Sequence, residues 1–500
     1  MDGAALLAGF QAALGPEPLL FCLIGVTLGT LVGVLPGIGA LAAISMLLPI
    51  TFYLEPATAL IMLAGIYYGA QYGGSTASIL LNTPGTVTQA VTCLDGYPMA
   101  KQGRAGVALF TTTITSFIGG CFAILLLMLL APALARVALS FGSPEYFAVM
   151  VFGLVIASTL SGGAPVKGFA MVALGALLGF VGIDANSGQL RYAFGYFELA
   201  DGLNLVAVAM GLFGIAEILS NLIGRRETPF AAQKVTLRSM LPSRDDIRRS
   251  ALPTARGTLI GSLAGVLPGT GAAIAPFISY ATEKRLSRTP DRFGTGAIEG
   301  IAAPEASNNA AAQAAFVPTL SLGIPGDAVM AIMLGALMIH GIVPGPQLIG
   351  QQPDLFWTLI ASFWIGNLIL LILNIPMIGL WVRVLRVPYH ILYPVMLFFI
   401  CVGVYSTNNS MADVLVAMVC GLFGYFLLAL RFPTAPLLLG FILAPLMETH
   451  LRRALMISQG DFTTFVGSPI SAGMLGLSAL VIVLTVLGAL RRRRAAPANG

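Results

Sequence analysis

The sequence predicts an all-α polytopic membrane protein with an inverted-topology repeat. Each half is expected to hold about five crossings, one re-entrant hairpin and one broken helix, and a C-terminal helix follows. Three observations lead to this fold class. The 500 residues are 57% hydrophobic and 9% charged, with mean hydropathy +0.90, whereas soluble domains are about one-quarter charged. Two proline- and glycine-containing motifs each occur twice. Equivalent loops of the two halves also differ in charge.

Long apolar segments predict the membrane spans. Residues 108–135 and 356–382 are apolar and exceed the roughly 20 residues that a spanning helix needs. Shorter segments at 146–161, 168–183 and 202–223 are each expected to cross once. A last helix is expected at about 468–490.

Basic residues divide the chain and orient it. The stretch 225–256 holds eight basic residues against three acidic ones, and the positive-inside rule places it in the cytoplasm. Arg491–Arg494 place the C-terminus on the same side. The basic residues are therefore interpreted as topology signals, and no nucleic-acid partner is expected. We expect an N-terminal repeat at 1–224, a linker at 225–256, an inverted repeat at 257–450, and an extra helix with a basic tail at 451–500.

Loops at equivalent places in the two halves carry opposite charge. The loop after the first GVLPG has only Glu55, whereas the loop after the second holds Lys284, Arg285, Arg288 and Arg292. Further on, Lys101 and Arg104 correspond to a segment, 341–354, without a basic residue. Parallel repeats would keep the same sign, so the two halves are predicted to cross the membrane in opposite directions.

The first repeated motif is GVLPGIGA at 33–40 and GVLPGTGA at 265–272. Loops of like charge flank each copy, which predicts a re-entrant hairpin with LPGxG at its tip. Irregular backbone at that depth must be buried in protein or line a watery cavity. Kinked spanning helices or close helix packing through glycine remain alternatives. The candidate binding residues at these tips are Pro36, Gly37, Gly39, Pro268, Gly269, Thr270 and Gly271.

The second repeated motif places small and polar residues before a turn that ends in PG. It occupies residues 67–86 in the first half and 304–327 in the second. Proline removes a backbone donor and glycine permits unwound geometry, so a discontinuous helix is predicted in each half. Helix ends that face such a gap suit an anion or a small cation. The candidate binding residues here are Ser75, Asn82, Thr83, Pro84, Gly85, Asn308, Asn309, Pro325 and Gly326.

Two acidic residues lie beside these motifs. Glu305 and Asp327 are candidates for ion coupling, because an ionisable group within the membrane is by default a functional hypothesis. Helix capping or a loop position near the interface is the alternative for both. No Lys or Arg occurs at 1–100 or 293–382, so a bound anion would rely on helix ends, amides, hydroxyls and a co-bound cation. The three histidines are dispersed, and no metal site is expected.

These motifs resemble those of one transporter family. Residues 33–86, the segment DGYPMAKQGRAGVAL and the later APEASNNAAAQAAFVPTLSLGIPGDAVMAIMLGALMIHGIVPGPQL are similar, in order and spacing, to the large membrane subunit of the tripartite tricarboxylate transporters. The similarity covers nearly the whole chain.

The resemblance implies a bacterial secondary transporter in the cytoplasmic (inner) membrane. It implies two partners, a small four-helix membrane subunit and a periplasmic solute-binding protein that delivers a carboxylate. It also implies uptake driven by a cation gradient, of sodium or protons, with no other cofactor. The backbone at Gly37, Gly39, Gly269 and Gly271 is expected to approach the anion. Hydrogen bonds to it are expected from Asn82, Thr83, Thr270, Asn308 and Asn309, with the cation near Asp327 or Glu305.

The residues also bear on other functions. A channel or a non-transporting scaffold of such a complex remains an alternative. An intramembrane aspartyl protease is disfavoured, because the glycine spacing around SLGIPGD is wrong and no second aspartate lies in a matching helix. The chain is therefore not expected to be an enzyme.

Overall fold

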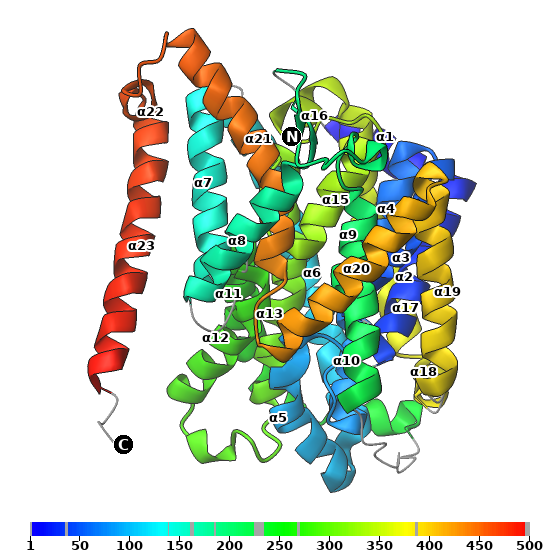
Figure 1. Ribbon diagram of the computed structural model, residues 1–500. Helices are drawn as coiled ribbons and strands as arrows, with labels where there is room; N and C mark the ends of the chain where they lie inside the picture. Colours follow the sequence, from blue (N-terminus) through cyan, green and yellow to red (C-terminus); the bar gives the residue numbers. More distant parts are fainter. Residues whose placement is uncertain are drawn as a thin grey trace, which may run out of the picture.

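The computed structural model describes residues 3–35, 39–138, 140–160, 165–184, 187–224, 235–267, 271–385 and 389–495. It is helical almost throughout (Figure 1). Within the described ranges a single two-stranded sheet occurs, where β1 (Gly182–Ile183) pairs antiparallel with β2 (Leu190–Arg191). The predicted all-helical class is thus confirmed.

The first half begins with two helices and continues through a helix break. Its elements are α1 (Gly3–Ala13), α2 (Pro16–Val34), α3 (Gly39–Leu47), η1 (Leu48–Tyr53), α4 (Pro56–Leu81), η2 (Val87–Gln89), α5 (Ala90–Met99), the π-helix η3 (Ala100–Arg104), α6 (Ala105–Ala138), α7 (Ser143–Leu160), α8 (Pro165–Gly179), η4 (Phe197–Leu199), α9 (Leu205–Ala209), the π-helix η5 (Met210–Ile215) and α10 (Ala216–Gly224).

The second half has a similar order of elements. They are η6 (Leu237–Met240), α11 (Arg244–Val266), α12 (Gly271–Leu286), η7 (Pro290–Arg292), α13 (Glu299–Ala314), α14 (Phe316–Leu322), α15 (Ala328–Ile339), α16 (Pro346–Gln351), α17 (Pro353–Asn374), α18 (Ile378–Val384), α19 (Tyr389–Asn408), α20 (Met411–Ala429), α21 (Ala435–Ile457), α22 (Thr464–Gly467) and α23 (Pro469–Ala495).

Five helical stretches in the described part of the chain are long and apolar enough to cross a membrane. They are Pro16–Val34, Val87–Ala138, Pro353–Asn374, Met411–Ala429 and Pro469–Leu487. The helices at Ser143–Thr159, Pro165–Gly179 and Leu205–Ser220 are also apolar but shorter. The chain is therefore a multi-pass membrane protein. By length α2 could span the membrane alone, so the re-entrant hairpin stays a prediction.

One kind of helix–helix contact, made through glycines, occurs in both halves of the chain. Three glycines of α2, one per turn, lie against carbonyl oxygens of α4, and an added Cβ would overlap them. Three glycines of α11 do the same against α13. The pairs are Gly25–Met62, Gly29–Ile66 and Gly33–Ala70 in the first half, and Gly257–Ala303, Gly261–Ser307 and Gly265–Ala311 in the second. Small residues allow this close approach of backbones, and the two halves use it at matched positions, while the inverted repeat itself stays a prediction.

Ion pairs tie α11 to its neighbours at one end of the bundle. Arg104, the last residue of η3, contacts Asp246 of α11 at 2.5 Å. Arg256 of α11 pairs with Glu283 of α12 at 2.6 Å. In Figure 1, α5, the α12–α13 connection and the C-terminal end of α23 lie at this lower end, whereas α1, α16 and α22 lie at the opposite end. The predicted basic loops of both halves thus share one end of the molecule.

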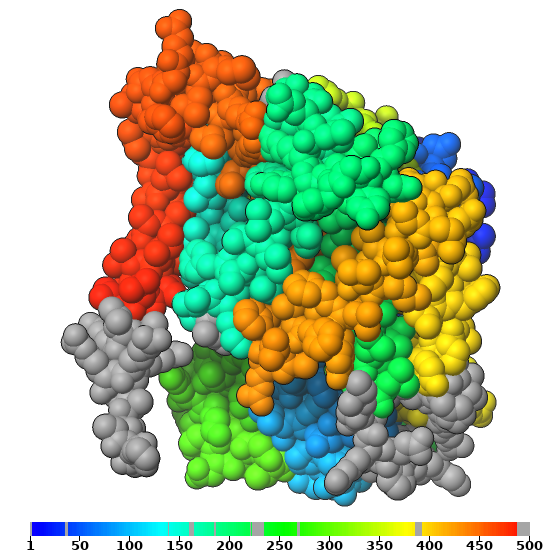
Figure 2. All heavy atoms as spheres, viewed as in Figure 1, coloured from blue at the N-terminus to red at the C-terminus, as the bar shows by residue number. Residues whose placement is uncertain are grey.

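Helix α23 stands at the edge of the molecule. It contacts α7 and α22, and in Figure 2 it forms a separate red column beside the bundle. Only 11% of the 18-residue apolar stretch within Pro469–Leu487 is buried. The predicted last helix is confirmed, and its exposed apolar surface suits contact with lipid.

Candidate functional site

A buried carboxylate lies where the two halves meet. Glu305 of α13 has no exposed surface. Its Oε2 accepts a hydrogen bond from Ser75 Oγ of α4 at 2.7 Å, and its Oε1 accepts one from Thr92 Oγ1 of α5 at 2.5 Å. In the described part of the chain no Lys or Arg forms an ion pair with Glu305. Helix α13 can enter this position because alanine and glycine make up half of its 16 residues.

Two adjacent amides of α13 extend the contact to other helices. Asn309 Nδ2 donates to Ser116 Oγ of α6 at 2.7 Å and to the Glu305 backbone oxygen at 3.2 Å. Asn308 Nδ2 donates to Gln71 Oε1 of α4 at 3.0 Å. Both asparagines are 2% exposed. Together they hold α13 between α4 and α6.

The break after α4 is connected to the same cluster. Gln89 Nε2 donates to the Gln71 backbone oxygen and to Ser75 Oγ, the latter at 3.3 Å. Its Oε1 accepts from the Thr86 backbone NH at 3.2 Å and from the Thr86 hydroxyl at 3.0 Å. This capping box orders the turn that follows the PG motif. Movement of the turn would therefore disturb Ser75 and, through it, Glu305.

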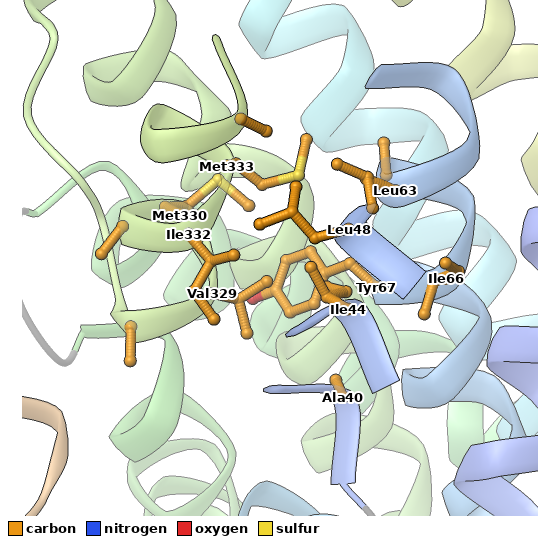
Figure 3. Packing of buried hydrophobic residues seen from close by; sticks show 14 of the residues in the cluster. Ala40, Ile44, Leu48, Leu63, Ile66, Tyr67, Val329, Met330, Ile332 and Met333 are labelled. Carbon is orange, nitrogen blue, oxygen red and sulfur yellow. The ribbon is translucent and has the colours of Figure 1, made fainter. Parts of the chain in front are cut away.

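The second acidic residue lies at a helix start. Asp327 is the N-cap of α15, where its Oδ1 accepts from the Met330 NH at 2.8 Å. Its Oδ2 accepts from Tyr67 OH of α4 at 2.6 Å. Figure 3 shows the Tyr67 ring among Ile44 of α3 and Val329 of α15. Asp327 thus caps a helix, as the alternative reading expected, and also bonds across the halves.

Both predicted helix breaks are present. Helix α4 ends at Asn82 in the left-handed region, with φ 56°, and α14 ends at Gly323 with φ 71°. Asn82 is exposed, so its side chain lies outside the buried cluster, and Thr83 Oγ1 donates to the Leu81 oxygen at 3.3 Å.

The glycine of each PG turn is closely packed. A Cβ on Gly85, after the half-buried Pro84, would overlap Gly74 and the Gly33 oxygen. A Cβ on Gly326, after the buried Pro325, would lie 2.8 Å from the Ala315 Cβ. Each turn therefore packs against a helix of its own half, and only a glycine fits.

The LPGxG tips are described only at their edges. Pro36 and Gly37, and likewise Pro268, Gly269 and Thr270, lie outside the described residues. Gly39, with φ 68°, begins α3 and faces the Glu217 carboxylate, 3.4 Å from where its Cβ would be. Gly271 begins α12 and leaves no room for a Cβ beside the Ala264 oxygen. Whether the tips touch a ligand stays a prediction.

Sequence reasoning missed several members of the cluster. Gln89, Thr92, Ser116 and the hydroxyl of Tyr67 were not singled out. Each is a polar side chain in a mainly apolar segment, which is a usable signal, but apolar helices of this chain hold many other threonines and serines. Only their spatial convergence on Glu305 and Asp327 distinguishes them.

The chain was compared with known proteins. Residues 19–439 match the tripartite tricarboxylate transporter TctA family. The chain belongs to this family. It is 52% identical over 489 residues, 98% of this chain and 97% of the relative, to an uncharacterized 52.8 kDa protein of the TAR-I ttuC' 3' region of Agrobacterium vitis.

A second relative matches part of the chain. An uncharacterized protein of the TAR-II ttuC' 3' region of the same organism is 54% identical over 234 residues, which is 47% of this chain and 97% of that protein. No solved structure matches the chain. As a member of the TctA family, the chain is a component of a tripartite transport system and works with partner subunits.

Proposed function

We propose that this TctA-family chain is the transmembrane importer of a tricarboxylate or related carboxylate. Uptake is driven by a cation gradient, and a periplasmic binding protein delivers the substrate. The small four-helix subunit is the second partner. In this proposal the protein lies in the bacterial inner membrane and its C-terminus faces the cytoplasm. The observation that carries this proposal is the polar cluster around Glu305, buried between the two halves of a chain that belongs to a transporter family.

The chemistry of the cluster supports a site for an anion with a cation. Asn308, whose amide nitrogen donates one proton to Gln71, can donate its second proton to an anion. Glu305 and Asp327 offer negative charge for a cation. We infer that Gly37, Gly39, Gly269 and Gly271 let the backbone approach the carboxylate.

An inverted repeat would let the site face either side in turn. The matched glycine contacts of α2 with α4 and of α11 with α13 support a repeat. The charge difference between equivalent loops supports opposite orientation. In this proposal the two halves rock or slide against each other, as in other repeat-built transporters.

The test is uptake into proteoliposomes that contain the chain with its two partner subunits. A panel of radiolabelled carboxylates is offered, while the sodium and proton gradients are varied separately. Saturable uptake of one carboxylate that requires one of the gradients is expected. Uptake that neither saturates nor requires a gradient would instead assign a channel. No uptake with any substrate or gradient would assign a scaffold.

A further inference from the structure

Three oxygen-bearing side chains form a stripe along α13. Glu305, Asn309 and Gln313 follow one another at intervals of four residues, so they lie on one face of the helix. They are 0%, 2% and 2% exposed. The stripe runs from the contact with Ser75 and Thr92 toward the end of α13 at Ala314.

The stripe offers acceptors that lack donors. Among the described residues, Asn309 Oδ1 and Gln313 Oε1 are buried without a hydrogen-bond partner. The Asn309 amide nitrogen, by contrast, is fully engaged with Ser116 and the Glu305 backbone. Buried polar atoms without a partner are rare, and each calls for an unseen ligand or water. Because these atoms are oxygens, the missing partner is a donor or a cation, not an anion.

Glu305 adds a charge that needs compensation. Its hydrogen bonds come from hydroxyl groups, and an ionised carboxylate buried without a cation is costly. The hydroxyl protons of Ser75 and Thr92 point at Glu305. The Ser75 oxygen also accepts from Gln89 Nε2 at 3.3 Å, which still leaves it one lone pair for a cation. A water molecule could satisfy the amide oxygens but would leave the negative charge of Glu305 uncompensated.

We propose that Glu305, Asn309 Oδ1 and the hydroxyl oxygens of Ser75, Thr92 and Ser116 form a sodium-binding site. Hard cations prefer oxygen ligands of this kind, and a single positive charge balances the single carboxylate. The inference rests on the proposed function in that it assigns the coupling cation. Asp327 is not a member of this site, because it caps α15 through the Met330 NH and bonds to Tyr67, and none of these groups belongs to the stripe or to its hydroxyl partners.

The test measures binding of radioactive sodium to the purified full-length chain, without carboxylate or partner subunits. Saturable binding is expected for the wild type. Glu305→Gln and Asn309→Ala should each weaken it by roughly ten-fold or more, because each removes a charged or buried ligand. Thr92→Val, which keeps the side-chain shape, should weaken it by a smaller factor. The matched control is Asn374→Ala, since this buried amide donates to the Leu370 oxygen of its own helix.

The outcomes separate the site from the function. Each variant is first compared with the wild type by its melting temperature in choline chloride, and Thr92→Val serves if the others do not fold. Absence of saturable sodium binding by the wild type would overturn the site, and so would unchanged binding by both Glu305→Gln and Thr92→Val. Sodium binding without any carboxylate uptake would contradict the proposed function and support the site. Sodium-driven carboxylate uptake, together with unchanged sodium binding in these variants, would support the proposed function and contradict the site.

Discussion

The hydroxyl of Ser75, in the first half, donates a 2.7 Å hydrogen bond to the carboxylate of Glu305, in the second half. This bond joins two segments that lie 230 positions apart in the chain. Both partners are buried, so water cannot replace the bond in this arrangement. The contact makes the relative position of α4 and α13 a determinant of the charge environment in the site.

Removal of the Ser75 hydroxyl should impair transport. A buried hydrogen bond to a charged group contributes about 1.5–3 kcal/mol, so Ser75→Ala is expected to lower initial uptake by roughly ten-fold or more. Ser78→Ala is the control, because Ser78 donates its hydroxyl proton to the Gly74 oxygen of its own helix and not to Glu305. Initial uptake rates at equal protein density measure the effect. Equal rates for Ser75→Ala and the wild type would contradict this role.

The hydroxyl of Tyr67 should matter more for transport than for stability. Tyr67→Phe removes the bond to Asp327 but keeps the ring in its apolar surroundings (Figure 3). We expect several-fold slower uptake with a nearly unchanged melting temperature. The control is Tyr405→Phe, at an exposed position. A large loss of melting temperature without a change in uptake would show a purely structural role.

The glycine contacts of the two repeats should be sensitive to added volume. Gly29→Ala and Gly261→Ala place a methyl group against the Ile66 and Ser307 oxygens. Each is expected to destabilise the fold by about 1–3 kcal/mol, as overpacking does. Gly476→Ala in α23 meets nothing within 4 Å and should be neutral or slightly stabilising. Thermal unfolding in detergent measures all three. Similar melting temperatures for all three would contradict the packing account.

Asp95 should hold the segment before α13 in place. It is fully buried, and its Oδ1 accepts hydrogen bonds from the NH groups of Gly294, Gly296 and Ala297 at 2.8–2.9 Å. Asp95→Ala leaves these donors without their partner, so their hydrogen exchange should accelerate. Asp291→Ala, at an exposed position nearby, is the control. Equal exchange rates in Asp95→Ala and the wild type would refute the clamp.

The ion pairs of the β1–β2 segment predict a pH dependence. The hydrogen bond from Arg191 lowers the pKa of Glu448, and the two side chains meet at 2.9 Å. A lowered pKa means that the contribution to stability is present above the unfolded-state pKa, about 4.3, and is lost as pH falls through the folded-state value.

Glu448→Gln tests this dependence. It should lower the melting temperature at pH 6–7 by a few degrees and have a smaller effect below about pH 4. The exposed Glu198→Gln is the control. A Glu448→Gln effect that does not change with pH would contradict the assignment.

Part of this structure followed from local sequence. The helix breaks near Asn82 and Gly323 were predictable, because proline and glycine restrict or free the backbone at the residue itself. The spans and the last helix were predictable from length and hydropathy. The convergence of Thr92 and Ser116 on α13 was not, because such contacts depend on how distant helices pack. The sequence also could not distinguish the two acids, since a helix cap such as Asp327 is recognised only by its backbone donor.

In the proposed function, the chain accumulates a carboxylate inside the cell by binding it at a site between its two halves. The most direct test of this claim is accumulation of a radiolabelled carboxylate in proteoliposomes under an imposed cation gradient, for wild type, Asn309→Ala and Gly269→Ala. We predict that the wild type accumulates substrate above the external concentration. Both variants should insert normally into the membrane. Their accumulation should be lower by roughly ten-fold or more, because Asn309→Ala removes a buried hydrogen bond and Gly269→Ala blocks the approach of the backbone to the substrate. Unchanged accumulation by both variants would contradict the claim.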